Sequence, residues 1–119
     1  MIEQYPLEER TLKFSAGIVR HCARLKQPTL HSIVNQVIRS ATSIGANYAE
    51  ANNASSKSDF KAKIFIAKKE AAETKYWLAL LAELGDSSEE LSSLRKEAQE
   101  ILMILQKIIT TLRVGKDEN

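Results

Sequence analysis

Lysine side chains at helical spacing are the residues of this sequence best suited to binding chemistry. Lys57, Lys61 and Lys68 are separated by four and then seven residues, so on a helix they share one face, which Lys75 extends. Ammonium groups in a row bind phosphates and release their counterions, which makes the row a candidate nucleic-acid surface. The same spacing also occurs on ordinary solvated helix faces. Arginines on neighbouring helices are candidates to join this surface, namely Arg20, Arg24 and Arg39.

Paired glutamates are the next arrangement with chemical potential. The pairs Glu70-x-x-Glu73 and Glu97-x-x-Glu100 invite a di-metal carboxylate interpretation. Such a site also needs Glu-x-x-His on two helices, and neither histidine of the chain follows a glutamate in that way. The sequence also lacks a glycine-rich phosphate loop, zinc-ligand spacing and a serine–histidine–acid order. We therefore predict a non-enzymatic protein with no metal and no cofactor.

The single cysteine and the two histidines are given structural roles. Cys22 lies on the predicted apolar face of the first helix, while the adjacent His21 points about 100° away, so no base is placed to activate the thiol. His21 and His31 are interpreted as surface or capping residues. A lone cysteine excludes an internal disulfide and fits a reducing compartment.

Length and composition bound the class of protein. The chain has 119 residues, a net charge of only +2 and 44% hydrophobic residues, which suits one globular domain over residues 1–119. No apolar run approaches the roughly 18 residues of a membrane span. The first ten residues, MIEQYPLEER, do not resemble a secretory signal. We expect a cytoplasmic protein without membrane association.

Apolar residues recur in steps of three and four along most of the chain. This periodicity predicts an all-α, antiparallel up-down-up-down four-helix bundle with helices at about 7–26, 30–53, 57–84 and 88–113. The four predicted seams are Leu12, Ser15, Ile18, Val19, Cys22 and Leu25; Leu30, Val34, Val37, Ala41, Ile44, Tyr48 and Ala51; Phe60, Ile64, Ala67, Ala71, Thr74, Leu78 and Leu81; and Leu91, Leu94, Ala98, Ile101, Leu105, Ile108 and Leu112.

Polar residues and glycines mark the predicted helix ends. Side chains with oxygen acceptors suit the N-terminal caps, and glycine suits the C-terminal ends. The predicted caps are Thr29 for the second helix, a capping box Ser56–Asp59 for the third and another at Ser87–Glu90 for the fourth, with Gly85 and Gly115 ending the third and fourth.

The third helix carries more apolar residues than one seam needs. The extra residues are Phe65, Ile66, Tyr76, Trp77 and Leu80. A helix that is apolar on most sides is usually buried on more than one side. We therefore predict a homo-oligomer with these residues at its interface; the alternative is that they widen the internal core.

The segment SIGANYAEA, from Ser43 to Ala51, resembles the four helix bundle proteins, also known as 23S rRNA intervening-sequence proteins. The resemblance extends over nearly the whole chain, including LEERTL at 7–12, SDF at 58–60, IAKKEA at 66–71 and YWL at 76–78. It implies an up-down bundle that assembles into a ring, with a pentamer suspected. Some members are encoded within large-subunit rRNA genes, and a similar bundle partners a reverse transcriptase and nucleic acid.

The polar residues of this segment are Ser43, Asn47 and Glu50. They can bind a polar group of a partner, or they can tie the second helix to the third, where Glu50 is expected near Lys57 or Lys61. We carry two hypotheses for the protein as a whole. The first is an oligomeric bundle that binds RNA, DNA or a nucleoprotein through its basic face. The second is a protein–protein scaffold with no nucleic-acid binding.

Overall fold

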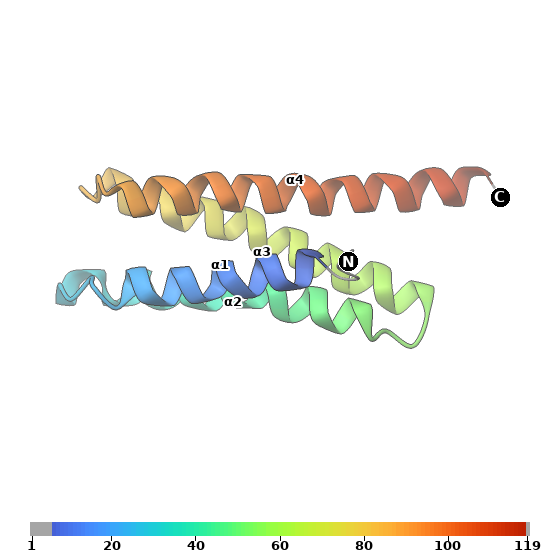
Figure 1. The fold of residues 1–119 in the computed structure, drawn as a ribbon, viewed down its shortest axis with the longest axis horizontal. Helices are drawn as coiled ribbons and strands as arrows, with labels where there is room; N and C mark the ends of the chain where they lie inside the picture. Colours follow the sequence, from blue (N-terminus) through green and yellow to red (C-terminus); the bar gives the residue numbers. More distant parts are fainter. Residues whose placement is uncertain (1–5, 119) are drawn as a thin grey trace.

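Four apolar seams meet along one axis and build the core of the molecule. The computed structural model describes residues 6–118, with side chains as far as residue 113. Its helices are α1 (Pro6–Cys22), α2 (His31–Asn52), α3 (Lys57–Glu83) and α4 (Glu89–Glu118), with a short 3₁₀ helix η1 (Pro28–Leu30) before α2. Each helix packs against its neighbours in the cyclic order α1, α2, α3, α4 (Figure 1). The predicted all-α four-helix bundle is confirmed.

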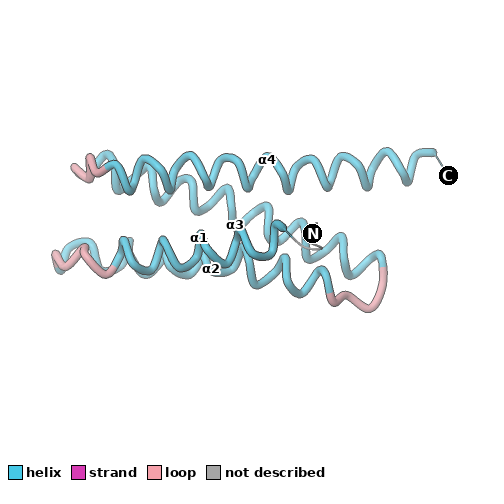
Figure 2. The backbone as a smooth tube through the Cα atoms, in the orientation of Figure 1, coloured by secondary structure: helices cyan, strands magenta, loops and turns pink. Residues whose placement is uncertain are grey.

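The seams of α2, α3 and α4 hold the positions that their spacing predicts. In α2 the seam residues from Val37 to Ala51 are buried, and in α3 the seam residues from Ile64 to Leu81 are buried. The α4 seam is buried from Leu91 to Leu105 and then continues at Ile109, so the prediction of Ile108 was wrong by one residue. The described helices are joined by short loops at the two ends of the bundle (Figure 2).

The predicted seam of α1 is right at Ile18 and Cys22, which are buried, and wrong at Leu12 and Val19. The buried residues of α1 include Leu7, Thr11, Phe14 and Ile18, whereas the predicted Leu12 is 69% exposed and Val19 is 44% exposed. The buried set alternates steps of four and three, but the polar Thr11 interrupts its apolar character. The Thr11 hydroxyl donates a hydrogen bond to the Glu8 carbonyl (3.0 Å), which satisfies the buried group within its own helix.

The connection between α1 and α2 also differs from the prediction. α1 ends at Cys22 rather than near residue 26, because the following N–H groups of Arg24 and Leu25 bond to carbonyls three residues back. Pro28 then opens η1, and Leu30 rather than Thr29 occupies the N-cap of α2, with no side-chain cap. Proline suits the first position of such a turn because it lacks the N–H that would be unpaired there.

The ends of α3 follow the predicted capping chemistry. Ser56 Oγ accepts a hydrogen bond from the Asp59 N–H (3.0 Å), as expected for a capping box, while Asp59 reaches the N–H of Ser55 (3.4 Å). At the other end Gly85 has φ +110°, and its N–H bonds to the Ala82 carbonyl (3.1 Å). The Asp86 N–H bonds to the Leu81 carbonyl (3.1 Å), which completes a Schellman motif.

α4 is capped one residue later than predicted and runs further. Ser88, not Ser87, accepts from the Leu91 N–H (3.1 Å) and donates its hydroxyl to Asp86 (2.7 Å). Glu90 is therefore released from the predicted capping box to make other contacts. The helix passes through Gly115 to Glu118, so Gly115 does not end it.

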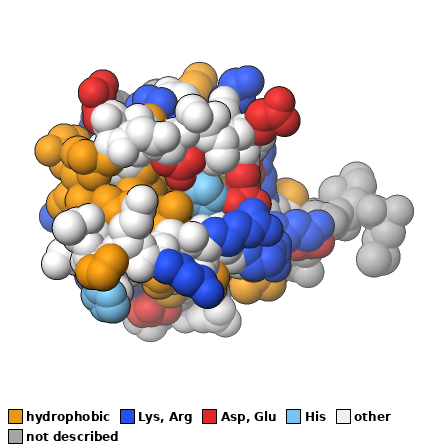
Figure 3. Space-filling model, turned by 90° about the vertical axis from the view of Figure 1, so that its left-hand side faces the viewer, with side chains coloured by type: hydrophobic (Ala, Val, Ile, Leu, Met, Phe, Trp, Pro, Cys, Tyr) orange, Lys and Arg blue, Asp and Glu red, His pale blue; other side chains and the backbone are white. Residues whose placement is uncertain are grey.

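His21 closes the end of the bundle where α1 meets the α3–α4 loop. It is only 4% exposed, which overturns its interpretation as a surface or capping residue. Its Nδ1 lies 2.5 Å from Glu90 Oε1 and its Nε2 lies 2.7 Å from Asp86 Oδ2. Arg24 bonds the same Glu90 carboxylate (2.8 Å). Figure 3 looks onto this end and shows acidic side chains beside basic ones.

Gly45 lies at a close contact between α1 and α2. A Cβ at this position would lie 3.0 Å from Thr11 Oγ1 and 3.1 Å from Thr11 Cβ. A Cβ at Gly17 would meet only Leu94 Cδ2, at 3.4 Å, which is ordinary contact. The two helical glycines therefore differ: Gly45 permits close packing, and Gly17 leaves room for a methyl group. None of the described helices is long and apolar enough to cross a membrane.

Gly17→Ala is expected to stabilise the protein by about 0.5–1 kcal/mol, because alanine restricts the unfolded chain and favours the helix. Gly45→Ala is the matched comparison, and it should lose this gain because Thr11 is buried and cannot move aside. Urea unfolding of both variants tests the difference. An equal stabilisation at the two positions would contradict the packing described for Gly45.

The carboxylates of α4 that pair with α1 make the fold sensitive to acid. The hydrogen bond from His21 lowers the pKa of Glu90, and the one from Arg10 lowers the pKa of Glu97. A carboxylate with a lowered folded pKa stabilises the fold above its unfolded pKa, and this contribution is lost as the pH falls through the folded value. Melting temperatures of wild type and Glu90→Gln should therefore converge between pH 5 and pH 3. Parallel losses in the two proteins would show that Glu90 does not carry the effect.

Candidate nucleic-acid interface

The lysine row of α3 lies along the edge of the helix that faces α4. Lys57 is exposed in the first turn, and Lys61, Lys68 and Lys75 are half-buried. Their positions follow from the buried seam of α3. Around the helix axis, each lysine lies next to the seam, on the side that faces α4. Lys75 lines a groove between α3 and α4, and the other three lysines of the row do not.

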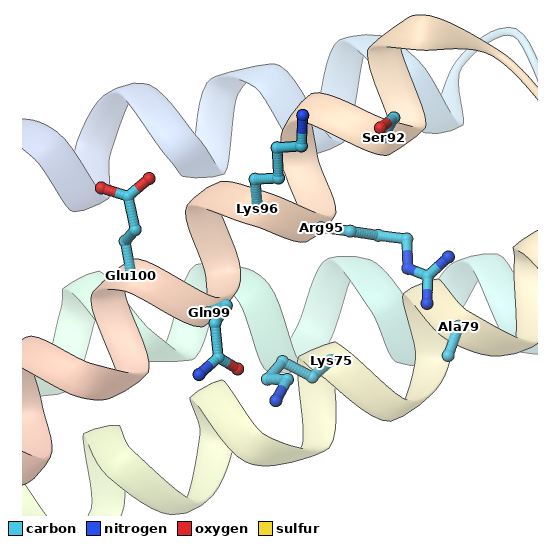
Figure 4. Close-up of a pocket in the computed structure, with 7 residues that line it drawn as sticks. All are labelled: Lys75, Ala79, Ser92, Arg95, Lys96, Gln99 and Glu100. Atoms are coloured by element: carbon cyan, nitrogen blue, oxygen red, sulfur yellow. The ribbon is translucent and has the colours of Figure 1, made fainter.

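This groove, called here the basic groove, has a volume of about 560 Å³. Figure 4 shows Arg95 and Gln99 extending from α4 towards α3. Lys75 extends from α3 towards Gln99, whereas the Arg95 guanidinium lies on the Ala79 side. Lys96 and Glu100 project from the other side of α4 at the rim of the groove. Ala79 and Ser92 complete the lining.

The cations of the basic groove have no carboxylate partner within the described part of the chain. Salt bridges on the described surface involve Arg10, Lys13, His21, Arg24, Arg39 and Lys63, and none involves Lys75, Arg95 or Lys96. Glu100 is the one acid at the rim, and it bonds Arg10 of α1 (2.8 Å). The field in the groove is therefore positive although the protein as a whole is nearly neutral.

The three arginines proposed alongside the lysines lie elsewhere. Arg24 pairs with Glu90 at the closing end, and Arg39 pairs with Glu70 (3.2 Å) and Glu73 on the α2 side of α3. Arg20 lines a different groove, between α1 and α4. The expectation that they extend the lysine face is therefore not met by their positions.

Arg95 and Lys96 are the cations that the sequence pattern did not single out. They precede Glu97, so the local charge of α4 appears balanced in the sequence. A signal was present nonetheless, because Arg95 follows the seam residue Leu94 directly and lies four residues after Leu91. Its helical position relative to that seam places it beside α3, as the structure shows.

The polar motif of α2 makes contacts within the fold. Asn47 Nδ2 donates to the Ser43 carbonyl (2.9 Å) and lies 3.0 Å from Ser43 Oγ. Glu50 pairs with Lys63 Nζ (2.9 Å), which raises the pKa of Lys63. Lys57 and Lys61 were the expected partners of Glu50, so that expectation was wrong, although the tie between α2 and α3 exists.

The extra apolar residues of α3 form a surface called here the α3 ridge, made of Phe65, Ile66, Tyr76, Trp77 and Leu80. Phe65, Ile66 and Tyr76 are exposed, and the other two are half-buried. The Tyr76 and Trp77 rings meet edge to face with centroids 5.3 Å apart, and Trp77 Nε1 donates to Glu73 (2.9 Å). Phe65, Ile66 and Tyr76 thus face outward, whereas Trp77 packs against the core, as the alternative expectation has it.

The paired glutamates serve as ion-pair partners. Arg39 bonds Glu70 and Glu73, and Arg10 bonds Glu97 through two nitrogens (2.6 and 2.7 Å). No group of three or more His, Cys, Asp or Glu side chains suited to a metal occurs among the described residues. Cys22 is buried, and its burial raises the pKa of the thiol to about 11, which disfavours the nucleophilic thiolate.

Comparison with known proteins places this architecture in a family. The model of the 23S rRNA-intervening sequence proteins matches residues 3–107, which is most of the chain. The chain belongs to the 23S rRNA-intervening sequence protein family. The family resemblance seen in the sequence is therefore confirmed.

A solved crystal structure has a fold similar to that of this 23S rRNA-intervening sequence protein. It is a protein of unknown function from the S23 ribosomal protein family of Bacteroides thetaiotaomicron, with 36% sequence identity and a TM-score of 0.78. The match covers 87% of this chain and 97% of that one. No curated protein matches the sequence.

Proposed function

We propose that this family member is a non-enzymatic, self-associating bundle that binds nucleic acid through the basic groove. The observation that carries the proposal is that Lys75 of α3 and Arg95 of α4 line one groove with no carboxylate partner in the described residues, with Lys96 at the rim. Elsewhere on the bundle the arginines Arg10, Arg24 and Arg39 are paired with acids.

The chemistry of the basic groove suits a phosphodiester backbone. Arg95 can donate two hydrogen bonds to one phosphate, and Lys75 supplies a point charge beside it. Ser92 and Gln99 add neutral hydrogen-bonding groups. The lysines Lys61 and Lys68 extend the positive edge along α3, so several phosphates can be contacted in line. Because backbone contacts carry no sequence information, the binding is expected to be independent of sequence.

RNA is the first ligand to test because the family is described by an rRNA intervening sequence. The cytoplasm is the proposed compartment, supported by the single free thiol of Cys22. The α3 ridge supports self-association, since exposed apolar residues grouped on one face mark interaction sites. The pentamer implied by the resemblance stays a prediction. If nucleic acid does not bind, the ridge favours the alternative of a protein–protein scaffold.

Removing the groove cations should weaken RNA binding and its dependence on salt. We expect the variant Lys75→Gln/Arg95→Gln/Lys96→Gln to lower the affinity at least tenfold at about 50 mM salt. Each lost phosphate contact reduces the log–log salt slope by about 0.7 for single strands and 0.9 for duplexes, so the slope should fall by about 2–3. Fluorescence anisotropy with labelled RNA and DNA across a salt series measures both quantities.

The matched control is Lys26→Gln/Lys107→Gln, which removes two exposed lysines outside the groove. It should change the affinity and slope much less than the groove variant. Equal losses in both variants would show a diffuse charge effect and overturn the assignment of the groove. No binding of wild type to either nucleic acid would overturn the nucleic-acid function itself.

Self-association is tested separately by mass. We expect light scattering to give wild type a mass of several chains, and the ridge variant Ile66→Gln/Tyr76→Gln to give a single chain. Both side chains are exposed, at 41% and 64%, so the fold should persist, as circular dichroism can verify. Met103→Gln, on the exposed surface of α4, is the control and should leave the mass unchanged. A monomeric wild type at high concentration would exclude the oligomer.

A further inference from the structure

The α4 side of the basic groove carries a stripe of three polar side chains, Ser92, Arg95 and Gln99. Successive members are three and four residues apart, so they follow one another along the face of α4 that borders α3. Neither the Ser92 hydroxyl nor the Gln99 amide has a side-chain hydrogen-bond partner among the described residues. Two neutral hydrogen-bonding groups are therefore open to a ligand, one turn before and one turn after Arg95.

Gln99 lies beside a cation of the facing helix. Its side chain is half-buried and extends towards α3, and Lys75 extends towards it (Figure 4). An amide both donates and accepts hydrogen bonds, as a serine hydroxyl does, whereas lysine and arginine only donate. The basic groove thus offers more than positive charge. It also offers groups suited to a neutral part of a ligand that donates and accepts at once.

We infer that the basic groove binds the ribose 2′-hydroxyls as well as the phosphates of double-stranded RNA. The inference rests on the nucleic-acid function proposed above and names its substrate class. The 2′-hydroxyl is the backbone group that RNA has and DNA lacks, and it both donates and accepts. Each ribose adjoins a phosphate along the strand, so Ser92 and Gln99 suit the hydroxyls while Lys75 and Arg95 hold the phosphates.

The lining of the groove favours a duplex over a single strand. Proteins that bind single strands stack the bases on aromatic side chains. None of the described residues that line the basic groove is aromatic, and Tyr76, which follows Lys75, belongs to the α3 ridge instead. An RNA duplex keeps its bases stacked within the helix and displays its 2′-hydroxyls across a wide, shallow minor groove. It therefore needs no aromatic partner.

The variant Ser92→Ala/Gln99→Met removes the two neutral groups and keeps every cation. We expect wild type to bind a short RNA duplex about tenfold more tightly than a DNA duplex of the same sequence, since each position adds a hydrogen bond that DNA cannot make. The variant should bind RNA as weakly as DNA, with its DNA affinity unchanged. Fluorescence anisotropy at about 50 mM salt measures these affinities.

The matched control is Ser93→Ala/Gln106→Met, which makes the same two substitutions on α4 outside the basic groove. Ser93 lines the groove between α1 and α4, and Gln106 lies beside Thr110 (3.4 Å). This control should keep the preference for RNA. Circular dichroism melting should show that both variants are folded, because methionine and alanine are good helix formers. An RNA preference that survives in Ser92→Ala/Gln99→Met would overturn the assignment of these residues.

A modified duplex separates the hydroxyl from the shape of the helix. RNA with 2′-fluoro groups keeps the A-form geometry but has no 2′-hydroxyl proton to donate. Wild type should bind it about tenfold more weakly than RNA, and Ser92→Ala/Gln99→Met should bind the two equally. Equal binding of RNA and 2′-fluoro RNA by wild type would show that only shape and charge are read, which overturns the inference.

The remaining outcomes distinguish the two proposals. Wild type that binds RNA and DNA duplexes equally, with a steep dependence on salt, keeps the nucleic-acid function and overturns the role of Ser92 and Gln99. Tighter binding of single-stranded RNA than of the duplex would overturn the choice of a duplex. Absence of binding to every nucleic acid would overturn the proposed function, and this inference with it.

Discussion

The orientation of α3 about its own axis decides which of its side chains are buried, which border α4 and which face outward. Its buried seam, from Ile64 to Leu81, packs against α2 on one flank and α4 on the other. Within this seam the Thr74 hydroxyl lies 2.9 Å from Ser40 Oγ of α2, and both are fully buried. Each hydroxyl also bonds a carbonyl of its own helix, Ser40 to Val37 (3.3 Å) and Thr74 to Glu70 (2.7 Å), so both groups are satisfied in the core. Their contact across the two helices favours one register of α2 against α3. Once that register is set, the lysines must border α4 and the ridge must face outward.

The distribution of ion pairs explains why the groove between α3 and α4 keeps its cations unpaired among the described residues. Acids on α4 face α1, where Glu90 and Glu97 pair with Arg24 and Arg10. Acids on α3 face α2, where they pair with Arg39. The boundary between α3 and α4 receives cations from both helices and no free acid. Exposed ion pairs contribute little stability each, so their main consequence here is to leave Lys75, Arg95 and Lys96 without an acid to neutralise them.

The sequence predicted the fold well where apolar residues alone carry the seam. The steps of three and four in α2 and α3 located their buried faces because nearly every buried position there is apolar. In α1 the buried Thr11 and His21 are polar, so the pattern shifted to the exposed Leu12 and Val19. Their burial is possible because a main-chain carbonyl and two carboxylates satisfy them, and such partners come from contacts that no local pattern contains.

The same reasoning shows which parts of the candidate site the sequence could predict and which parts depend on packing. The lysine row follows from spacing within one helix, so the sequence contained it. Lys75 and Arg95 come to line the same groove only because of how α3 and α4 align, and this alignment is determined by the packed seams. The basic groove and the outward residues of the α3 ridge then lie on different faces of α3. An assembly joined through the ridge would therefore leave each basic groove open and repeat it with every copy. Weak phosphate contacts gain overall affinity when several copies engage one strand, provided that the strand can span them.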